Sequence, residues 1–442
     1  MISVAGFSSL AGFSSAAGSF IVANCLVLTI RILVLLLASA SMFSVQAAEV
    51  PTAAPEDVGM SAAKLAKVDD ALEGLVELKR LAGGTVVIAR RGKIVHFKSY
   101  GLADIEKRRP MKNDAIMRFY SMSKAITSAA VMILADEGKL DVNDPVFKHI
   151  PALNGLKVAT ANGLVSPKRE VTIADLLRHT AGYTYGGSPQ AASDAAFRKV
   201  DPLAPTRTVE QMSELLANVP LAFQPGEDWT YGISIDVLGR VIEVASGQSL
   251  DKFLKKRIFK PLDMKDTGFF VPKKKHDRFA QVYDSDGKGN LTIGDNAAHR
   301  DFTKPRAFLP GGGGLVSTAI DYLRFLMMIQ QGGRFEGKQI VSEKSVRLMT
   351  TSQLPKEVPH IYFGDQQRVG VGFGFGFSVR EKMSDWDPTG RIGEYGWGGL
   401  ASTHYWVSPK DELIVITFEQ TMPYSFMTEF AVKDLVYDAI EE

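Results

Sequence analysis

The pattern of apolar and polar positions predicts strands near both ends of the chain and helices between them. Runs rich in β-branched and aromatic residues are typical of strands, and the first two flank Arg91-Gly92, which predicts a hairpin. The expected strands cover 85–90, 94–100, 371–380, 403–407 and 412–419.

Helical spacing and capping residues place the helices. Gly83 and Gly84 are expected to close the first one, and Thr208 with Gln211 has the pattern of a capping box. Ser317 is expected to cap the helix that follows it. The expected helices cover 61–81, 121–138, 172–178, 236–244, 250–259, 318–330 and 425–440.

Strands at both ends with helices between them indicate one sheet built from both ends of the chain, with a helical insertion. We therefore expect an α/β (α+β) fold in a single domain over residues 55–440. The sheet lobe is expected at about 55–135 and 300–440, and the helical lobe at about 136–299. A cleft between the two lobes is a natural place for a ligand.

The composition changes this picture little. The chain has 442 residues, of which 45% are hydrophobic and 23% charged, as is typical of a globular protein with a large core. Lys and Arg number 51 and Asp and Glu 49, and this near balance argues against a nucleic acid as partner. The single cysteine, Cys25, lies in the N-terminal segment, so an oxidising compartment is compatible with the rest of the chain.

Residues 1–48 differ from the remainder. Arg31 is followed by an apolar run and then by small residues up to Ala47 and Ala48, the order typical of a secretory signal. We expect cleavage near Ala47 or Ala48 and export to the periplasm or out of the cell, which leaves no stable membrane partner. The alternative is an uncleaved membrane anchor over 20–42, against which the central Arg31 counts.

Ser121 and Lys124 form an S-x-x-K pair at the start of a helix that continues with ten apolar or small residues. Three residues make almost one helical turn, so the two side chains share a face. Desolvation and the positive end of the helix dipole are expected to make this lysine lose its proton more readily than a lysine in water. A neutral amine can then activate the serine hydroxyl, and the Ser121 N–H can hold an oxyanion.

The pattern alone is weak. Ser61 with Lys64 and Ser249 with Lys252 match it too, and both are interpreted as helix caps with solvated lysines. The apolar helix sets Ser121 apart, but context alone leaves both catalysis and a capped core helix open. No Gly-x-Ser-x-Gly elbow occurs, which argues against an α/β-hydrolase.

Several motifs in a fixed order carry a family resemblance: Ser-Met-Ser-Lys at 121–124, Leu-Leu-Arg-His-Thr-Ala-Gly at 176–182, Phe-Gln-Pro-Gly at 223–226, a stretch at 231–239, Phe-Lys-Pro-Leu-Asp-Met at 259–264 and Gly-Gly-Gly-Leu-Val-Ser-Thr at 312–318. The chain resembles the serine β-lactamase and penicillin-binding superfamily, class C branch, and most of all the family VIII carboxylesterases. The resemblance covers residues 55–440 and implies a β-lactamase-like fold, with Ser121 as nucleophile and Lys124 as general base.

The second motif of that family, Tyr-x-Asn, corresponds to Tyr231-Gly232-Ile233. The resemblance implies that Tyr231 is a general acid or base, although a tyrosine packed under a helix is the structural alternative. Ile233 stands where the family has asparagine, so it has no amide with which to hold the acylamino group of a β-lactam. We expect Ile233 at the substrate site.

The third motif, Lys-Thr-Gly or His-Thr-Gly, is replaced by Trp397-Gly398-Gly399, the form used by family VIII esterases. By resemblance, these three residues contact substrate and the N–H of Leu400 is the second oxyanion donor. β-Lactams and D-alanyl peptides carry a carboxylate that suits a lysine, whereas an indole offers an apolar wall. Arg391 is a candidate replacement for the missing cation.

We therefore expect a serine hydrolase that forms an acyl-enzyme, acting as a carboxylesterase on small-molecule esters of short to medium acyl length, without metal or cofactor. The alternatives are a β-lactamase, a D-amino-acid peptidase or amidase, and a cell-wall-binding protein without turnover. His179 is interpreted as structural. The lysines at 273–275, with Lys255, Lys256 and Arg257, are interpreted as a solvated face, with an anionic wall polymer or membrane surface as the lesser alternative.

Overall fold

The computed structural model describes residues 49–441 except 189–190 and 295–300. Residues Val50–Glu442 form one compact unit. The two alternatives for residues 1–48, a cleaved signal and a membrane anchor, concern a segment outside the described residues. Within the described ranges, no helix is both long enough and apolar enough to span a bilayer.

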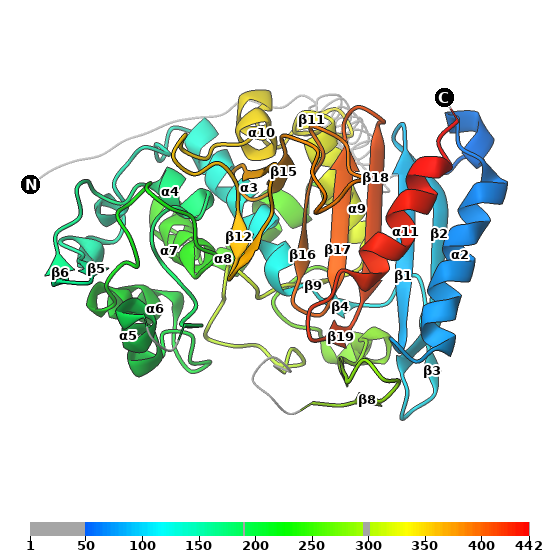
Figure 1. The fold of residues 1–442 in the computed structure, drawn as a ribbon, viewed down its shortest axis with the longest axis horizontal. Helices are drawn as coiled ribbons and strands as arrows, with labels where there is room; N and C mark the ends of the chain where they lie inside the picture. Colours follow the sequence, from blue (N-terminus) through cyan, green and yellow to red (C-terminus); the bar gives the residue numbers. More distant parts are fainter. Residues whose placement is uncertain (1–48, 189–190, 295–300, 442) are drawn as a thin grey trace, which may run out of the picture. The chain divides into compact units, whose positions relative to one another are not determined.

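An eight-stranded sheet with antiparallel neighbours occupies the centre of this unit, in the order β14-β15-β16-β17-β18-β1-β2-β3 (Figure 1). β1 pairs with β18, with Thr85 opposite Phe418, so early and late parts of the chain share one sheet. The predicted fold class is therefore confirmed. The strands are β1 Gly83–Arg90, β2 Lys93–Asp104, β3 Arg109–Pro110, β14 Val371–Phe373, β15 Ser378–Arg380, β16 Tyr395–Gly399, β17 Thr403–Ser408 and β18 Leu413–Glu419.

Helices cover the two faces of the sheet. Side chains alternate between faces along a strand, so Val86 and Ile88 of β1 pack under α2 (Ala62–Glu77) and α11 (Met427–Asp438), which lie side by side (Figure 1). Val87 and Ala89 belong to the larger core on the other face. That core contains α3 (Ser123–Asp136) and α9 (Ala319–Gln330).

The remaining helices form the helical part, in which α7 contacts α3, α4, α6 and α8. Thr172 and Thr208 form capping boxes at the starts of α4 and α6, and the second was predicted. The helices are α4 Ile173–Leu177, α5 Ala192–Val200, α6 Val209–Leu215, α7 Ser234–Ser246, α8 Leu250–Leu254 and α10 Glu343–Thr350. The short strands are β4 Met117–Arg118, β5 Val158–Thr160, β6 Gly163–Val165, β7 Tyr283–Ser285, β8 Leu291–Thr292, β9 Val316–Ser317, β10 Arg334–Phe335, β11 Lys338–Gln339, β12 Tyr362–Phe363, β13 Gln366–Gln367 and β19 Thr421–Met422.

Predicted boundaries were wrong in several places. The first helix ends at Glu77 because Lys79 turns into the left-handed region, with φ of 52°, and Gly83 and Gly84 then belong to β1. The strand expected over 371–380 is two strands that pair with each other as a hairpin. The cap of α9 is Thr318, whose side chain accepts from the N–H of Asp321, rather than Ser317.

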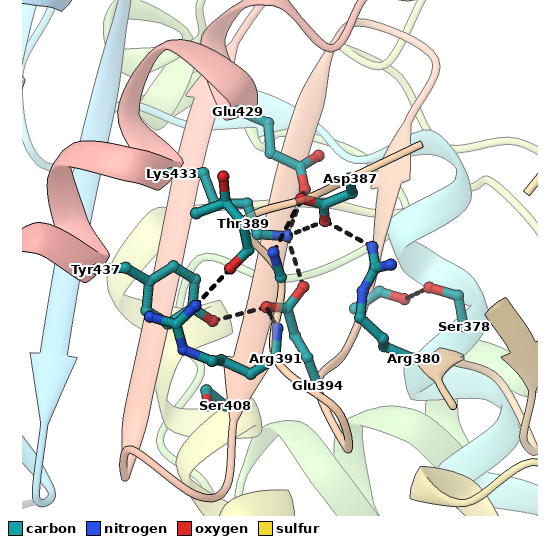
Figure 2. A network of polar contacts seen from close by, with 12 residues as sticks. Ser378, Arg380, Asp387, Thr389, Arg391, Glu394, Ser408, Glu429, Lys433 and Tyr437 are labelled. Carbon is teal, nitrogen blue, oxygen red and sulfur yellow. Dashed lines mark hydrogen bonds and ion pairs between the residues drawn. The ribbon is translucent and has the colours of Figure 1, made fainter. Parts of the chain in front are cut away.

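A buried network of charged side chains fastens α11 to the segment that leads into β16 (Figure 2). Lys433 Nζ lies 2.6 Å from Asp387 Oδ2 and 2.5 Å from Glu394 Oε1. Arg380 donates to the same Asp387 oxygen at 2.7 Å, and Tyr437 donates to Glu394 at 2.6 Å. Mutual pairing offsets the cost of burying these charges, so the network fixes α11 against β15 and the approach to β16.

Candidate active site

Ser121 and Lys124 lie where the sheet meets the helical part. Ser121 is in a turn of 3₁₀-helix, Tyr120–Met122, directly before α3, and Lys124 is in the first turn of α3. Lys124 is only 1% exposed, and its Nζ lies 3.3 Å from Ser121 Oγ. The S-x-x-K residues are therefore within hydrogen-bonding distance, although the α-helix begins at Ser123 rather than at Ser121 as predicted.

The backbone immediately before Ser121 is strained. Tyr120 has a φ of 43°, in the left-handed region, which costs a residue other than glycine about 1–2 kcal/mol. The buried ring of Tyr120 packs edge-on against Phe302 and holds this conformation. Such strain is typical of turns that present a functional side chain.

Three oxygen atoms surround Lys124 Nζ. They belong to Ser121, to the hydroxyl of Tyr185 at 3.1 Å and to the carbonyl of Gly312 at 2.7 Å. The ring of Tyr231 lies beside them, with its centroid 4.6 Å from Nζ. An ammonium has three protons to donate and a neutral amine two, so the neutral form can donate to Tyr185 and Gly312 while its lone pair faces Ser121.

Tyr185 and Asp236 are site residues that the sequence analysis missed. The hydroxyl of Tyr185 lies 3.4 Å from Asp236 Oδ2, and Asp236 Oδ1 accepts from the N–H of Gly312 at 2.9 Å. Asp236 is 2% exposed, in the first turn of α7. Arg240 and Glu243 follow Asp236 at four and seven positions, the spacing of one helix face. The sequence pattern therefore does not distinguish this buried aspartate from a solvent-exposed one, although its burial requires a polar partner.

Two glycines permit the close approaches around the site. A Cβ on Gly312 would lie 2.5 Å from Asp236 Oδ2, so a larger residue would displace the carboxylate. A Cβ on Gly399 would collide with the carbonyl oxygen of Phe119, two residues before the serine. The second glycine of Trp397-Gly398-Gly399 thus lets β16 lie directly against the backbone that carries Ser121.

Tyr231 is held by aromatic neighbours and one hydrogen bond. Its hydroxyl accepts from Trp397 Nε1 at 3.2 Å, and its ring packs against His179 and Trp397 with centroids 4.9 and 5.3 Å away. Trp397 is therefore a hydrogen-bond donor as well as the predicted apolar surface. Burial holds the pKa of the His179 imidazole well below its usual range, and neither ring nitrogen has a hydrogen-bond partner among the described residues.

A cavity of about 330 Å³, here called the Ser121 cavity, lies beside the serine. Leu400, whose N–H was predicted as an oxyanion donor, lines it together with Ser121. Apart from Ser121 and the carboxylate of Asp236, its side chains are apolar or phenolic, and no lysine or arginine of the described chain lines it. The lining residues are Tyr120, Ser121, Tyr185, Leu203, Tyr231, Asp236, Pro310, Gly312, Gly313 and Leu400.

The other predicted substrate residues do not line this cavity. Ile233 is fully buried at the start of α7 and belongs to the hydrophobic core. Gly398 and Gly399 are buried within β16, and the Trp397 indole donates to the hydroxyl of Tyr231, which does line the cavity. Contact of these four residues with substrate stays a prediction.

Arg391 does not supply the missing cation. Its guanidinium donates to the carbonyl of Thr389 at 2.7 Å and stacks 4.0 Å from the ring centroid of Tyr437. It therefore belongs to the network beside α11 (Figure 2), and it does not line the Ser121 cavity. Elsewhere in the described ranges, no group of three or more His, Cys, Asp or Glu side chains is placed to hold a metal ion.

Comparison with known proteins places the chain in a family. A sequence model of the Beta-lactamase family matches residues 68–433. Protein Rv1367c of Mycobacterium tuberculosis (strain ATCC 25618 / H37Rv) is 34% identical over 354 residues, which cover 78% of this chain and 86% of that protein. Esterase EstB of Burkholderia gladioli is 31% identical over 415 residues, which cover 88% of this chain and 98% of that protein.

Solved structures agree in fold. EstCE1, described as a hydrolase with promiscuous acyltransferase activity, superimposes with a TM-score of 0.73 at 26% identity over 85% of this chain and 99% of its own. Simvastatin synthase (LovD) from Aspergillus terreus gives a TM-score of 0.69 at 20% identity, over 85% and 98%, a likeness of fold alone. The chain belongs to the Beta-lactamase family, as a hydrolase of that fold.

Proposed function

We propose that the chain is a serine carboxylesterase that cleaves neutral small-molecule esters of short to medium acyl length through an acyl-enzyme. The observation that carries the proposal is the 3.3 Å contact between the buried Lys124 amine and Ser121 Oγ, beside a cavity whose described lining includes no cation. The similarity to esterase EstB at 31% identity supports an ester as substrate.

In the proposed acylation step, Ser121 Oγ attacks the ester carbonyl carbon while its proton passes to Lys124 Nζ. The N–H groups of Ser121 and Leu400 stabilise the negative oxygen of the tetrahedral intermediate. Tyr185 and Asp236 act as positioning residues, because their hydrogen bonds hold the Lys124 amine in place.

Tyr231 completes the reaction in this proposal. When the tetrahedral intermediate collapses, the carbonyl–oxygen bond of the ester breaks and the alcohol leaves with a proton from Tyr231. Tyr231 recovers its proton from Lys124, whose Nζ lies 4.6 Å from the centroid of the tyrosine ring. Water then attacks the acyl-enzyme by the same proton transfers in reverse, which releases the acid.

Charge supports a neutral ester over a β-lactam or a D-alanyl peptide. The Ser121 cavity contains the Asp236 carboxylate, and among its described lining residues there is no lysine or arginine to receive a substrate carboxylate. A second carboxylate placed beside Asp236 would be repelled at short range. Apolar side chains such as Leu203, Pro310 and Leu400 instead suit an alkyl chain.

The test is steady-state hydrolysis of p-nitrophenyl acetate and butyrate beside nitrocefin, with Ser121→Ala as control. Fast ester turnover with little nitrocefin cleavage, both lost in Ser121→Ala, supports the proposal. Efficient nitrocefin cleavage makes the chain a β-lactamase, and turnover of D-amino-acid amides makes it a peptidase or amidase. A trapped acyl-enzyme without turnover assigns it to the penicillin-binding proteins that only bind.

Acyl transfer to an alcohol is a second candidate. EstCE1, at 26% identity, is described as having promiscuous acyltransferase activity, and the apolar Ser121 cavity can admit an alcohol in place of water. Chromatography of the products of p-nitrophenyl butyrate with added methanol distinguishes the two. Formation of methyl butyrate in excess of butyrate supports acyl transfer to methanol. Formation of butyrate alone supports hydrolysis.

We also propose that the chain is exported to the periplasm or out of the cell with removal of its first 47 or 48 residues. The order of Arg31, an apolar run and small residues before Ala47 and Ala48 supports this. N-terminal sequencing of the protein from its own cells is the test. A terminus at Ala48 or Glu49 supports cleavage, whereas a longer chain in the membrane fraction supports the anchor.

A further inference from the structure

A second cavity, of about 680 Å³, lies beside the segment that follows α8. None of its lining residues also lines the Ser121 cavity, yet Leu309 lines this cavity and Pro310 lines the other. Two consecutive residues of one loop therefore line the two different cavities. We call this second cavity the basic groove, and its lining residues are Ile116, Asp251, Lys255, Phe259, Lys260, Asp263, Met264, Lys265, Asp266, Thr267, Gly268, Phe269, Phe270, Val271, Pro272, Lys275, Pro305, Arg306 and Leu309.

The floor of the basic groove is apolar. Phe259, Met264 and Phe269 are almost completely buried there, while Phe270 at the edge is 36% exposed. α8 continues into one turn of π-helix, Lys255–Phe259, both ends of which line the groove. Turns of π-helix are rare in proteins, and those that occur often lie at functional sites. An apolar hollow with an exposed aromatic side chain at its edge is typical of a surface that binds a partner.

The groove carries a net positive charge, because its lining includes five Lys or Arg and three Asp residues. Residues 251–278 contain ten Lys or Arg and four Asp, whereas the whole chain has 51 basic and 49 acidic residues. Two of those acids are already neutralised, Asp263 by Lys265 and Asp266 by Lys275. The positive charge of this segment therefore exceeds what its own carboxylates balance.

Four of the lysines that carry this excess lie in the groove or directly beside it. Lys255 and Lys260 line the groove, and Lys273 and Lys274 directly follow the lining residue Pro272. All four are exposed, and none forms an ion pair with a carboxylate in the part of the chain that the structure describes. Lysines of this kind keep the charged end in water while the stem covers apolar surface, an arrangement that suits contact with an anionic interface.

We propose that the basic groove docks the chain onto an anionic lipid surface. The lysines contact lipid phosphates, and Phe270 with the apolar floor receives the glycerol and upper acyl part of a lipid. An anionic polysaccharide would satisfy the lysines but leave Phe270 and the floor in water, so lipid is the better match. The inference does not depend on the chemistry at Ser121. It places the Ser121 cavity one loop away from a source of membrane-dissolved esters.

The experiment is co-sedimentation of the full chain with vesicles of phosphatidylcholine alone and of phosphatidylcholine with phosphatidylglycerol at three to one. The first 49 residues are common to all variants, so their own affinity for bilayers cancels from the comparison. We expect tighter binding to the anionic vesicles, weakened by added salt. Lys255→Glu with Lys260→Glu should weaken this binding by at least about tenfold.

Two further variants complete the test. Lys344→Glu with Lys356→Glu makes the same change of charge at exposed lysines that do not line the groove and should bind as wild type. Phe270→Ser should weaken binding to anionic vesicles while p-nitrophenyl butyrate turnover in solution stays unchanged. Equal affinity for both kinds of vesicle, or equal losses in the two lysine pairs, overturns the proposal. If Lys255→Glu with Lys260→Glu loses affinity for a soluble anionic polysaccharide while Phe270→Ser has no effect on binding to vesicles, the groove binds a polymer. That outcome also overturns the proposal.

Discussion

Lys124 Nζ lies 3.1 Å from the phenolic oxygen of Tyr185, a residue 61 positions further along the chain. Tyr185 continues the contact to the buried carboxylate of Asp236. Ser121, Lys124, Tyr185 and Asp236 thus form one polar chain. In the proposed mechanism, the negative end of this chain stabilises the positive charge that Lys124 gains with the serine proton, so catalysis should depend on residues outside the S-x-x-K motif.

Tyr185→Phe tests this dependence. Removing the hydroxyl deprives Lys124 of one hydrogen-bond partner and cuts its link to Asp236, so kcat for p-nitrophenyl butyrate should fall about 10- to 100-fold with little change in KM. Asp236→Asn should show a similar loss. Steady-state kinetics over pH 6 to 10 measures both.

The matched control is Tyr183→Phe. Tyr183 is buried two residues earlier, and its hydroxyl has no hydrogen-bond partner among the described residues. The same loss of one oxygen should therefore leave kcat within about twofold of wild type. An equal loss in Tyr183→Phe and Tyr185→Phe would mean that the loop, rather than the hydroxyl, matters.

Trp397→Phe separates the two functions of this indole. Phenylalanine keeps an aromatic ring beside Tyr231 but removes the N–H that donates to the Tyr231 hydroxyl at 3.2 Å. Without that donor the tyrosine is less well oriented, so kcat should fall about tenfold. An unchanged kcat would reduce Trp397 to the apolar wall expected from sequence.

Gly312→Ala should disrupt the candidate site by displacing the Asp236 carboxylate. Its Cβ would lie 2.5 Å from Asp236 Oδ2, and the carbonyl of the same residue accepts from Lys124. We expect a loss of about 100-fold or more in kcat/KM, with about 1–3 kcal/mol of stability. Gly313→Ala is the control, because a Cβ there meets its nearest neighbour at 3.6 Å, an ordinary contact. Comparable losses in both variants would mean that the close approach of Gly312 to Asp236 is not the cause of the loss.

The contact between Ser121 and Lys124 was predictable because it is local. Ser121 and Lys124 are three residues apart, and their contact follows from helical spacing alone. Tyr185 and Asp236 are 51 residues apart, and no periodicity in the sequence predicts that they are in contact. Lys124 stands out because it is a charge inside an apolar helix, whereas Asp236 shares its helix with Arg240 and Glu243 and does not stand out.

Errors in the fold arose where tertiary contacts prevail over local propensity. The amphipathic pattern of the first helix continues to Leu81, but Leu81 packs into the cluster beneath α2 and α11, and the chain turns at Lys79 to reach β1. Ile233 was expected at the substrate site because it stands where the family has asparagine. α7 starts at Ser234 and turns the Ile233 side chain into the core, a result that depends on helix packing.

Lys433→Met tests the network in Figure 2. Lys433 is 2% exposed and is shared by Asp387 and Glu394, so its loss leaves two buried carboxylates with fewer partners. We expect destabilisation of about 3–5 kcal/mol in urea unfolding. Lys64→Met, which breaks a surface pair with Glu441 at 3.6 Å, should cost less than about 1 kcal/mol. Similar values for the two would show that burial adds nothing to this network.

Glu419→Gln tests how the buried Glu419 carboxyl makes stability depend on pH. Burial raises the pKa of the Glu419 carboxyl from 4.5 to about 7, and its Oε2 has no hydrogen-bond partner among the described residues. The folded state favours the protonated form of this carboxyl. Its contribution to the free energy of unfolding is therefore complete below pH 4.5 and is lost as the pH rises to about 7. The difference corresponds to about 3 kcal/mol. Between pH 5 and 8, wild type should therefore lose about 2–3 kcal/mol relative to Glu419→Gln in urea unfolding. The exposed Glu357→Gln should track wild type at both pH values. A constant gap between wild type and Glu419→Gln would mean that the carboxyl stays in one protonation state throughout, and that its neighbours, rather than its burial, determine its charge.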